Sequence, residues 1–366
     1  MKCFAKKIKI TIAAFAGMAG AFAFAPLDAH ATATSVVGDG NASNTLVAAS
    51  TSSAAAAATA AQIGAAVASA IVVGSPAQGK SVALAGDGKT PVGYFFNTRS
   101  LGESAGTKNR GLGVWVQGAW TGVDNGETGG EFDGTIINVV GGIDYKPKKL
   151  NGKAVFGIAV AWEDVDVDTD FNVGTFEGSG VSIAPYAGVT LGKNLVADIS
   201  LGYSFLDYDV SRTLGGTVTS DFDAYRIFGA INLGGDWTVK KRIRISPKIG
   251  VLGFYEEQDA YTDSSGTNVG KTRVHLGRAS GGAEVGFMIK AIEPFIGAKA
   301  NFDFDRNAPV RLANGVIAED DEFSATFSAG VNLRKKNVTG QIKGETNQFK
   351  NEITSWSVIG RVRVDF

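Results

Sequence analysis

The C-terminal stretch, residues 352–366, constrains the fold more than any other part of this sequence. Its side chains alternate strictly between two sets, which is the period of a β-strand. The first set is apolar and comprises Trp356, Val358, Gly360, Val362, Val364 and Phe366. The second set is mostly polar and comprises Ser357, Ile359, Arg361, Arg363 and Asp365. Because no further element follows to cover the apolar set, we expect that face to meet a non-aqueous surrounding.

Residues 1–31 are expected to be a secretory signal peptide, removed between Ala31 and Thr32. An apolar run from Ile10 to Ala25 is followed by the small-residue exit Ala29-His30-Ala31, and a basic segment precedes the run, with Lys2, Lys6, Lys7 and Lys9. Cleavage changes the formal net charge from −1 to −4 and removes the chain's one cysteine. The mature chain therefore needs no disulfide and has no basic patch for nucleic acid.

Residues 32–110 are a low-complexity leader in which residues 53–73 are predicted to form a helix. This segment is dominated by Ala, the best helix former, with Thr51 and Ser52 as expected N-caps and Gly74 at its end. Twenty-one residues at 1.5 Å each span about 31 Å. The alternative is an unstructured Ala-rich linker.

From residue 111 to residue 366 the chain is predicted to form twelve strands. Each sets bulky apolar residues against small or polar ones, and the stretch 195–205 is among the clearest. The connections alternate in length: short ones are expected at 147–152, 192–194, 235–241, 290–291 and 334–337, and long ones at 163–180, 208–220, 256–272 and 306–321. Apolar-out, polar-in strands with short turns at one rim and long loops at the other are typical of transmembrane β-barrels.

The predicted fold is all-β, a twelve-stranded antiparallel transmembrane β-barrel with a short Ala-rich helix in its lumen. A lumen of twelve strands is wider than side chains alone fill, and one thin helix fits it. The side chains expected to face this lumen are long and charged: Arg226, Arg244, Lys248, Glu284 and Lys299.

The sequence predicts no enzyme, cofactor site or metal site. His275 is the single histidine left after residue 31, which excludes His-based catalysis and multi-His metal centres. The expected long connections are acidic, with Asp164, Asp166 and Asp168 in one of them.

About residues 53–366 resemble the translocator domain of autotransporters (type V secretion). The resemblance is carried by the barrel pattern and by short motifs: Val114-Trp115-Val116, Gly141-Gly142-Ile143-Asp144-Tyr145, Leu201-Gly202-Tyr203-Ser204 running to Arg212, Ser246-Pro247-Lys248-Ile249-Gly250, and the terminal Phe366. It implies a Gram-negative outer-membrane location, contact with membrane lipid and lipopolysaccharide, insertion by the export and barrel-assembly machinery, and a monomer. It also implies that the last strand is an assembly signal, carried by Trp356, Val362, Val364 and Phe366.

The predicted function is an autotransporter-type barrel with little or no passenger. Residues 32–52 are far fewer than an ordinary passenger, and the segment 53–73 lacks the Asn at which self-cleaving members of the family cut. Two alternatives stay open. One is a small diffusion pore, and the other is a surface interaction protein that acts through the acidic loops.

Overall fold

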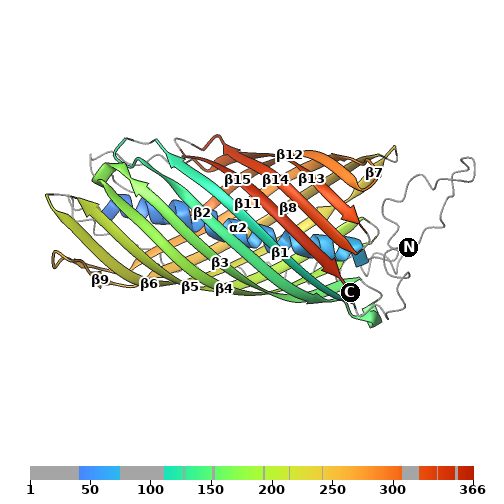
Figure 1. Cartoon of the computed structure of the whole chain (residues 1–366), viewed down its shortest axis with the longest axis horizontal. Helices are drawn as coiled ribbons and strands as arrows, with labels where there is room; N and C mark the ends of the chain where they lie inside the picture. Colours follow the sequence, from blue (N-terminus) through green and yellow to red (C-terminus); the bar gives the residue numbers. More distant parts are fainter. Residues whose placement is uncertain are drawn as a thin grey trace, which may run out of the picture. The chain divides into compact units, whose positions relative to one another are not determined.

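The computed structural model describes residues 41–74, 111–126, 128–150, 153–192, 194–213, 215–240, 242–306, 321–335, 337–350 and 353–366. The expected signal peptide, its cleavage site at Ala31 and Thr32, and the segment 75–110 lie outside these ranges. One long helix, α2 (Asn41–Gly74), runs inside a barrel of strands (Figure 1). In the described part of the chain, no helix is both long and apolar enough to cross a bilayer.

Twelve long strands of the described residues make the barrel, and the predicted fold is confirmed. They are β1 (Leu112–Asn125), β2 (Phe132–Tyr145), β3 (Ala154–Thr169), β4 (Gly174–Thr190), β5 (Leu195–Thr213), β6 (Thr217–Gly235), β8 (Ile243–Gln258), β11 (Thr272–Phe287), β12 (Ile292–Arg306), β13 (Phe323–Lys335), β14 (Val338–Gln348) and β15 (Ile353–Asp365). Each pairs antiparallel with the preceding and following long strand, and β15 pairs with β1 to close the barrel.

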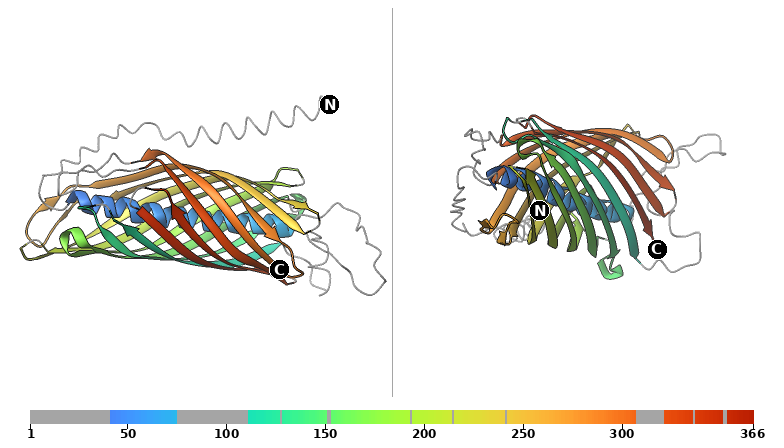
Figure 2. Two further views of the ribbon diagram at one scale, coloured as in Figure 1. Left: turned by 90° about the horizontal axis from the view of Figure 1, so that it is seen from above. Right: turned by 60° about the vertical axis from the view of Figure 1, so that its left-hand side comes forward.

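Five short elements decorate the two rims. They are η1 (Lys148–Leu150), η2 (Asp170–Asn172), β7 (Trp237–Val239), β9 (Tyr261–Thr262) and β10 (Asn268–Val269). The first and third lie at the rim that carries the C-terminus, which we call the short-turn rim, and the others lie at the opposite or loop rim (Figures 1 and 2).

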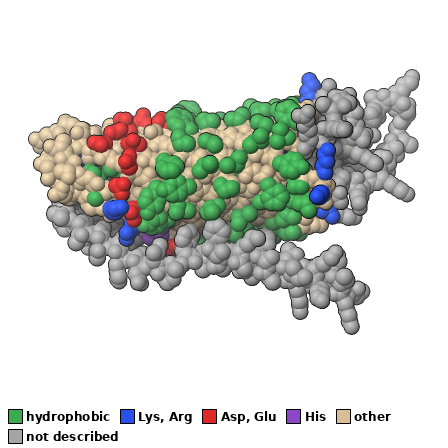
Figure 3. Space-filling model, turned by 90° about the horizontal axis from the view of Figure 1, so that it is seen from below, with side chains coloured by type: hydrophobic (Ala, Val, Ile, Leu, Met, Phe, Trp, Pro, Cys, Tyr) green, Lys and Arg blue, Asp and Glu red, His purple; other side chains and the backbone are tan. Residues whose placement is uncertain are grey.

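The alternation of residue types places apolar side chains outside and polar ones inside. The outer face carries an apolar belt (Figure 3), in which Trp120, Phe205 and Phe302 are 50%, 66% and 47% exposed. The inner face buries charged side chains such as Arg226 and Arg363, each at most 1% exposed. This inversion of a soluble protein's arrangement is what a strand between lipid and lumen requires.

Two of the long connections expected from the sequence are wrong, because the strands continue through them. β3 runs to Thr169 and β4 resumes at Gly174; β5 runs to Thr213 and β6 resumes at Thr217. In β3 the side chains of Val165 and Val167 are buried inside the barrel, while Asp164, Asp166 and Asp168, which alternate with them, face outward. The period of two therefore continues beyond the apolar belt, with carboxylates replacing apolar residues on the outer face.

These outward carboxylates form an acidic rim beside the apolar belt (Figure 3). Like charges stand directly opposite one another across neighbouring strands. The pairs are Asp124 with Asp133, Asp133 with Asp168, Asp166 with Glu177, Glu177 with Asp209, Asp209 with Asp221, and Asp207 with Asp223. Such pairs are unfavourable unless water or counterions screen them, so the rim marks where the barrel leaves the apolar layer. Among the described residues, no group of three or more His, Cys, Asp or Glu is arranged to hold a metal ion.

The connection between β8 and β11 is fastened to the loop rim through Asp263. Arg212 approaches its carboxylate at 2.6 Å, and the backbone N–H groups of Ser265 and Thr267 donate to it at 3.0 and 2.9 Å. Burial alone would raise the pKa of Asp263, but these hydrogen bonds and the guanidinium outweigh it and hold the pKa below its ordinary value. The stabilisation is thus fully present at neutral pH and is lost as the pH falls through this lowered pKa.

The seam between the last and first strands is secured by a buried ionic cluster at the short-turn end. Arg363 of β15 donates two hydrogen bonds of 2.7 Å to Asp144 of β2 and approaches Asp365 at 2.8 Å. Lys146 approaches the same Asp365 at 2.9 Å, and the Tyr186 hydroxyl of β4 donates to Asp144 at 3.0 Å. The cluster thus connects β15 to strands on the far side of β1, in addition to the backbone ladder.

We predict that Arg363→Ala weakens the closed barrel strongly, because it leaves the carboxylate of Asp144 buried without its partner. The expected loss is about 3–5 kcal/mol of unfolding free energy. The measurement is the temperature or urea concentration at which the fast-migrating folded band is lost on a gel.

The matched control is Arg361→Ala, two residues earlier on the same inner face. In the described part of the chain no carboxylate forms an ion pair with Arg361, and one of its guanidinium nitrogens is buried without a hydrogen-bond partner, so its removal breaks no ion pair. Equal stability of the two variants would contradict the role assigned to the cluster.

Candidate functional site: the helix in the lumen

The helix inside the barrel is longer than the sequence predicted. It starts at Asn41, not near residue 53, and its 34 residues span about 51 Å. Thr51 and Ser52, expected as N-caps, lie within the helix, where Thr51 Oγ1 donates to the carbonyl of Val47 at 2.9 Å. Val47 and Ala48 are buried by the barrel. Burial against surrounding strands extends the helix beyond what local propensity indicates.

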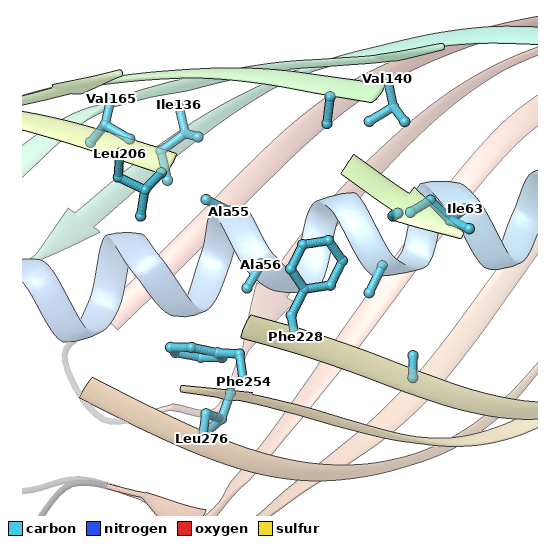
Figure 4. Close-up of a cluster of buried hydrophobic side chains, with 14 of the residues drawn as sticks. Ala55, Ala56, Ile63, Ile136, Val140, Val165, Leu206, Phe228, Phe254 and Leu276 are labelled. Carbon is cyan, nitrogen blue, oxygen red and sulfur yellow. The ribbon is translucent and has the colours of Figure 1, made fainter. Parts of the chain in front are cut away.

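Small side chains allow α2 to pack closely against the strands. Besides Val47 and Ala48, its buried apolar residues are Ala55, Ala56, Ala60, Ile63, Ala66, Val67 and Ala70. Larger side chains from the strands surround it in one apolar cluster, including Ile136, Val140, Val165, Leu206, Phe228, Phe254 and Leu276 (Figure 4). The strands that α2 packs against are β1 to β6, β8 and β11.

One hydrogen bond and one close approach fix the position of the helix along the barrel. Asn138 of β2 donates from Nδ2 to Thr59 Oγ1 at 2.9 Å. At Gly64 the wall comes so close that an added Cβ would lie 3.0 Å from Asn232 Nδ2, 3.1 Å from Asp198 Oδ1 and 3.3 Å from Lys248 Nζ. Gly64 is in the second half of the helix, and its neighbour Asp198 lies near the short-turn end of β5. The helix therefore begins at the loop rim and ends at the short-turn rim (Figures 1 and 2).

A buried ionic network centred on Arg226 lies in the loop-side half of the barrel. Its Nε donates to Glu256 at 2.9 Å, and its Nη1 donates to Glu163 at 2.8 Å. The hydroxyl of Tyr208 donates to Glu256 at 3.2 Å. All four side chains are buried, and they come from β3, β5, β6 and β8. The network ties four strands together from inside the lumen, beside the helix.

The other side chains expected to face the lumen also lie on the inner face. Arg244 donates to Asp236 at 2.8 Å and to Glu293 at 3.0 Å near the short-turn rim. Lys248, Glu284 and Lys299 lie on β8, β11 and β12, in that order. The side chains of both lysines are exposed even though they point inward. Sequence reasoning did not single out Arg363 or Arg361, although both share the polar parity of the last strand.

The residues expected to form the assembly signal lie on the outer face. Trp356, Val362 and Phe366 are 46%, 48% and 55% exposed, and Val364 is partly exposed. Trp356 packs edge-on against Trp120 of β1, with ring centroids 5.1 Å apart. Their role in assembly stays a prediction.

We predict that Arg226→Ala costs about 3–5 kcal/mol of unfolding free energy, because two buried carboxylates lose their shared cation. The loss should appear as a lower urea midpoint of the purified barrel in detergent. Combining Arg226→Met with Glu163→Gln and Glu256→Gln should restore much of it, since no charge is then stranded.

Arg273→Ala is the matched control. Arg273 approaches Glu257 at 3.0 Å, but its side chain is 56% exposed, and exposed pairs contribute about 0–1 kcal/mol. A loss for Arg226→Ala no larger than for Arg273→Ala would contradict the assignment.

The chain is similar in sequence and in fold to known outer-membrane barrels. The family model "Autotransporter beta-domain" matches residues 114–344, more than half of the chain. No curated protein sequence matches. The translocator domain of the autotransporter NalP from Neisseria meningitidis superposes with a TM-score of 0.59 at 14% identity, covering 72% of this chain and 90% of that one. The β-domain of the Bordetella autotransporter BrkA gives 0.58 at 15% identity, covering 70% and 100%. With its closed barrel and its helix, the chain belongs to the autotransporter β-domain family, whose barrels lie in the outer membrane of Gram-negative bacteria.

Proposed function

We propose that this protein is a translocator barrel that retains α2 in its lumen as a plug. The polarity of the helix supports this function: its first residue, Asn41, is at the loop rim and its last, Gly74, at the short-turn rim. In this proposal the residues before Asn41 are carried to the cell surface, and the helix stays behind. The proposal assigns no catalysis and no cofactor. That only a short passenger precedes the helix stays a prediction.

The packing of the helix favours a plugged barrel over a freely open pore. Along β1 to β5 the inward side chains are largely buried against α2, so the helix fills that part of the lumen. Outside the barrel an isolated helix of this kind would be marginally stable in water. The acidic residues Asp164, Asp166, Asp168 and Glu177, in turn, lie on the outer face of continuous strands and not in a long loop, which weakens the alternative of a ligand-binding loop surface.

The proposal is tested by locking the helix to the wall with a disulfide. Gly64→Cys and Asn232→Cys place two thiols where the helix and the wall come close together. The natural Cys3 lies in the expected signal peptide, so the mature chain adds no competing thiol. In oxidised cells we expect a cross-linked species that migrates differently from the reduced one on a denaturing gel.

The matched control is Gly64→Cys with Ile231→Cys. Ile231 precedes Asn232 on β6, and successive strand residues point to opposite faces, so this pair is separated by the sheet. A barrel that folds yet forms no Gly64–Asn232 cross-link, or forms the control cross-link equally well, would contradict a retained plug.

We further propose that the outer face of β15 is the assembly signal. Phe366 ends this face and its N–H donates to the carbonyl of Leu112 at 2.8 Å, so the last residue is already part of the seam. Deleting Phe366 should lower the amount of folded barrel in the outer membrane several-fold at equal synthesis, measured as the folded band in membrane fractions.

Asp365→Asn in a chain that keeps Phe366 is the control that distinguishes loss of the assembly signal from loss of barrel stability. It weakens the ionic cluster at the seam but leaves the outer face unchanged. If it lowers membrane insertion as much as the deletion while the purified deletion variant folds normally, the outer face is not the signal.

A further inference from the structure

The helix does not fill the lumen evenly. It packs against β1 to β6, β8 and β11. On β14 every inward side chain is partly exposed, from one rim to the other: Thr339, Gln341, Lys343, Glu345 and Asn347. On β2, by contrast, the inward residues Ile136, Asn138 and Val140 are at most 2% exposed. Water therefore reaches the inner face of one wall along β14, although five inward side chains of the neighbouring strands are at most 4% exposed: Phe295, Asn301, Asp303, Ser324 and Arg363. We call this wall the open side and define it as the inward faces of β12 to β15 with the adjoining parts of β8 and β11.

Small residues keep the open side wide. Inward positions near its middle are Ser280, Gly282, Gly297, Ser328 and Gly330, none of which extends far into the lumen. Lys248 and Lys299 lie on either side of Gly282 in the sheet register, and both are exposed to the lumen. Two cations thus face water from neighbouring parts of the wall.

The fixed charges of the open side have a positive excess. Among the described residues its middle and loop-side part holds seven cations, of which Arg306 pairs with Glu322 at 3.9 Å, and the other six are Lys248, Arg278, Lys299, Lys343, Lys350 and Arg361. Four carboxylates face them, which are Asp198, Glu284, Asp303 and Glu345, so the formal balance is +2. Toward the short-turn rim Arg244 and Arg334 are balanced by Asp236 and Glu293.

Half of the excess arises at Asp303, which two cations share, and half among Lys248, Lys299 and Arg361, which outnumber the nearby carboxylates Asp198 and Glu284 by one. Arg278 and Lys350 share Asp303 at 2.8 and 3.1 Å, and Lys343 pairs with Glu345 at 2.6 Å. Within the described part of the chain, no ion pair includes Lys248, Lys299 or Arg361, and Arg361 Nη1 has no hydrogen-bond partner. These groups can attract mobile ions of opposite charge.

We propose that the open side is a water-filled path along which small inorganic anions pass the retained helix in preference to cations. Fixed positive charge between low-dielectric walls raises the local concentration of anions and lowers that of cations. The acidic rim lies on the outside of the barrel and does not line this path. The inference rests on the proposed function, since it takes the helix as present in the lumen.

The test is the reversal potential of the full chain in a planar lipid bilayer under a KCl gradient at neutral pH. We expect small conductance steps and a preference for chloride over potassium of about threefold or more. Lys248→Glu with Lys299→Glu changes the balance of the open side from +2 to −2 and should reverse the preference. Should this double variant fail to fold, Lys248→Gln with Lys299→Gln should bring the permeability ratio close to one.

The matched control is Lys148→Glu with Lys149→Glu, which makes the same change in net charge on η1, outside the lumen. It should keep the chloride preference of the unmodified chain. Absence of conductance, a preference for potassium in the unmodified chain, or equal ratios in lumen and control variants would each overturn the proposal. Failure of the plug itself has a different signature, namely large conductance together with no cross-link between positions 64 and 232.

Discussion

The hydrogen-bonded pairing of the last strand with the first is the interaction on which the rest of this structure depends. Residues Gly113 to Asn125 pair one for one with Ile353 to Asp365. Inside a hydrocarbon layer, unpaired N–H and C=O groups find no water, so a sheet can cross only if it has no edge. Closure in turn creates an interior, and the interior makes it possible to bury Arg226, Arg363 and a helix. The ionic cluster at Arg363 strengthens the contact where closure is completed.

Much of the barrel could be predicted from the sequence because its two faces meet different solvents. A period of two is visible in single strands, such as residues 195–205, without knowledge of their neighbours. The same period misled at residues 163–180, where charges were taken as a loop. The buried Val165 and Val167 could have indicated a continuing strand, because they alternate with the aspartates. The early start of α2 could not be predicted, since it depends on burial of Val47 and Ala48 by strands more than sixty residues away.

The partners of the lumen charges were beyond sequence reasoning for another reason. Parity indicates which side chains face inward, and it placed Arg226 and Lys248 alike in the lumen. Their surroundings differ because the register and the position of the helix decide what each meets. Arg226 lies between Glu163 and Glu256 in a filled region, whereas Lys248 lies opposite small residues in a region that water enters. One side of the lumen is thus filled and joined by buried ion pairs, and the other side is open to water and carries a positive excess.

The small side chains of α2 have a mechanical consequence. A helix with large side chains interlocks with its surroundings, and sliding along its axis would require many of them to move at once. α2 presents mostly Ala to the wall, so few side chains oppose its movement along the axis: the hydrogen bond between Asn138 and Thr59, the close packing at Gly64, and larger buried side chains such as Ile63 and Val67. A shift of one residue, about 1.5 Å, separates the first two contacts together. Few contacts therefore oppose movement of the helix along its axis, and the hydrogen bond at Thr59 and the close packing at Gly64 define its position.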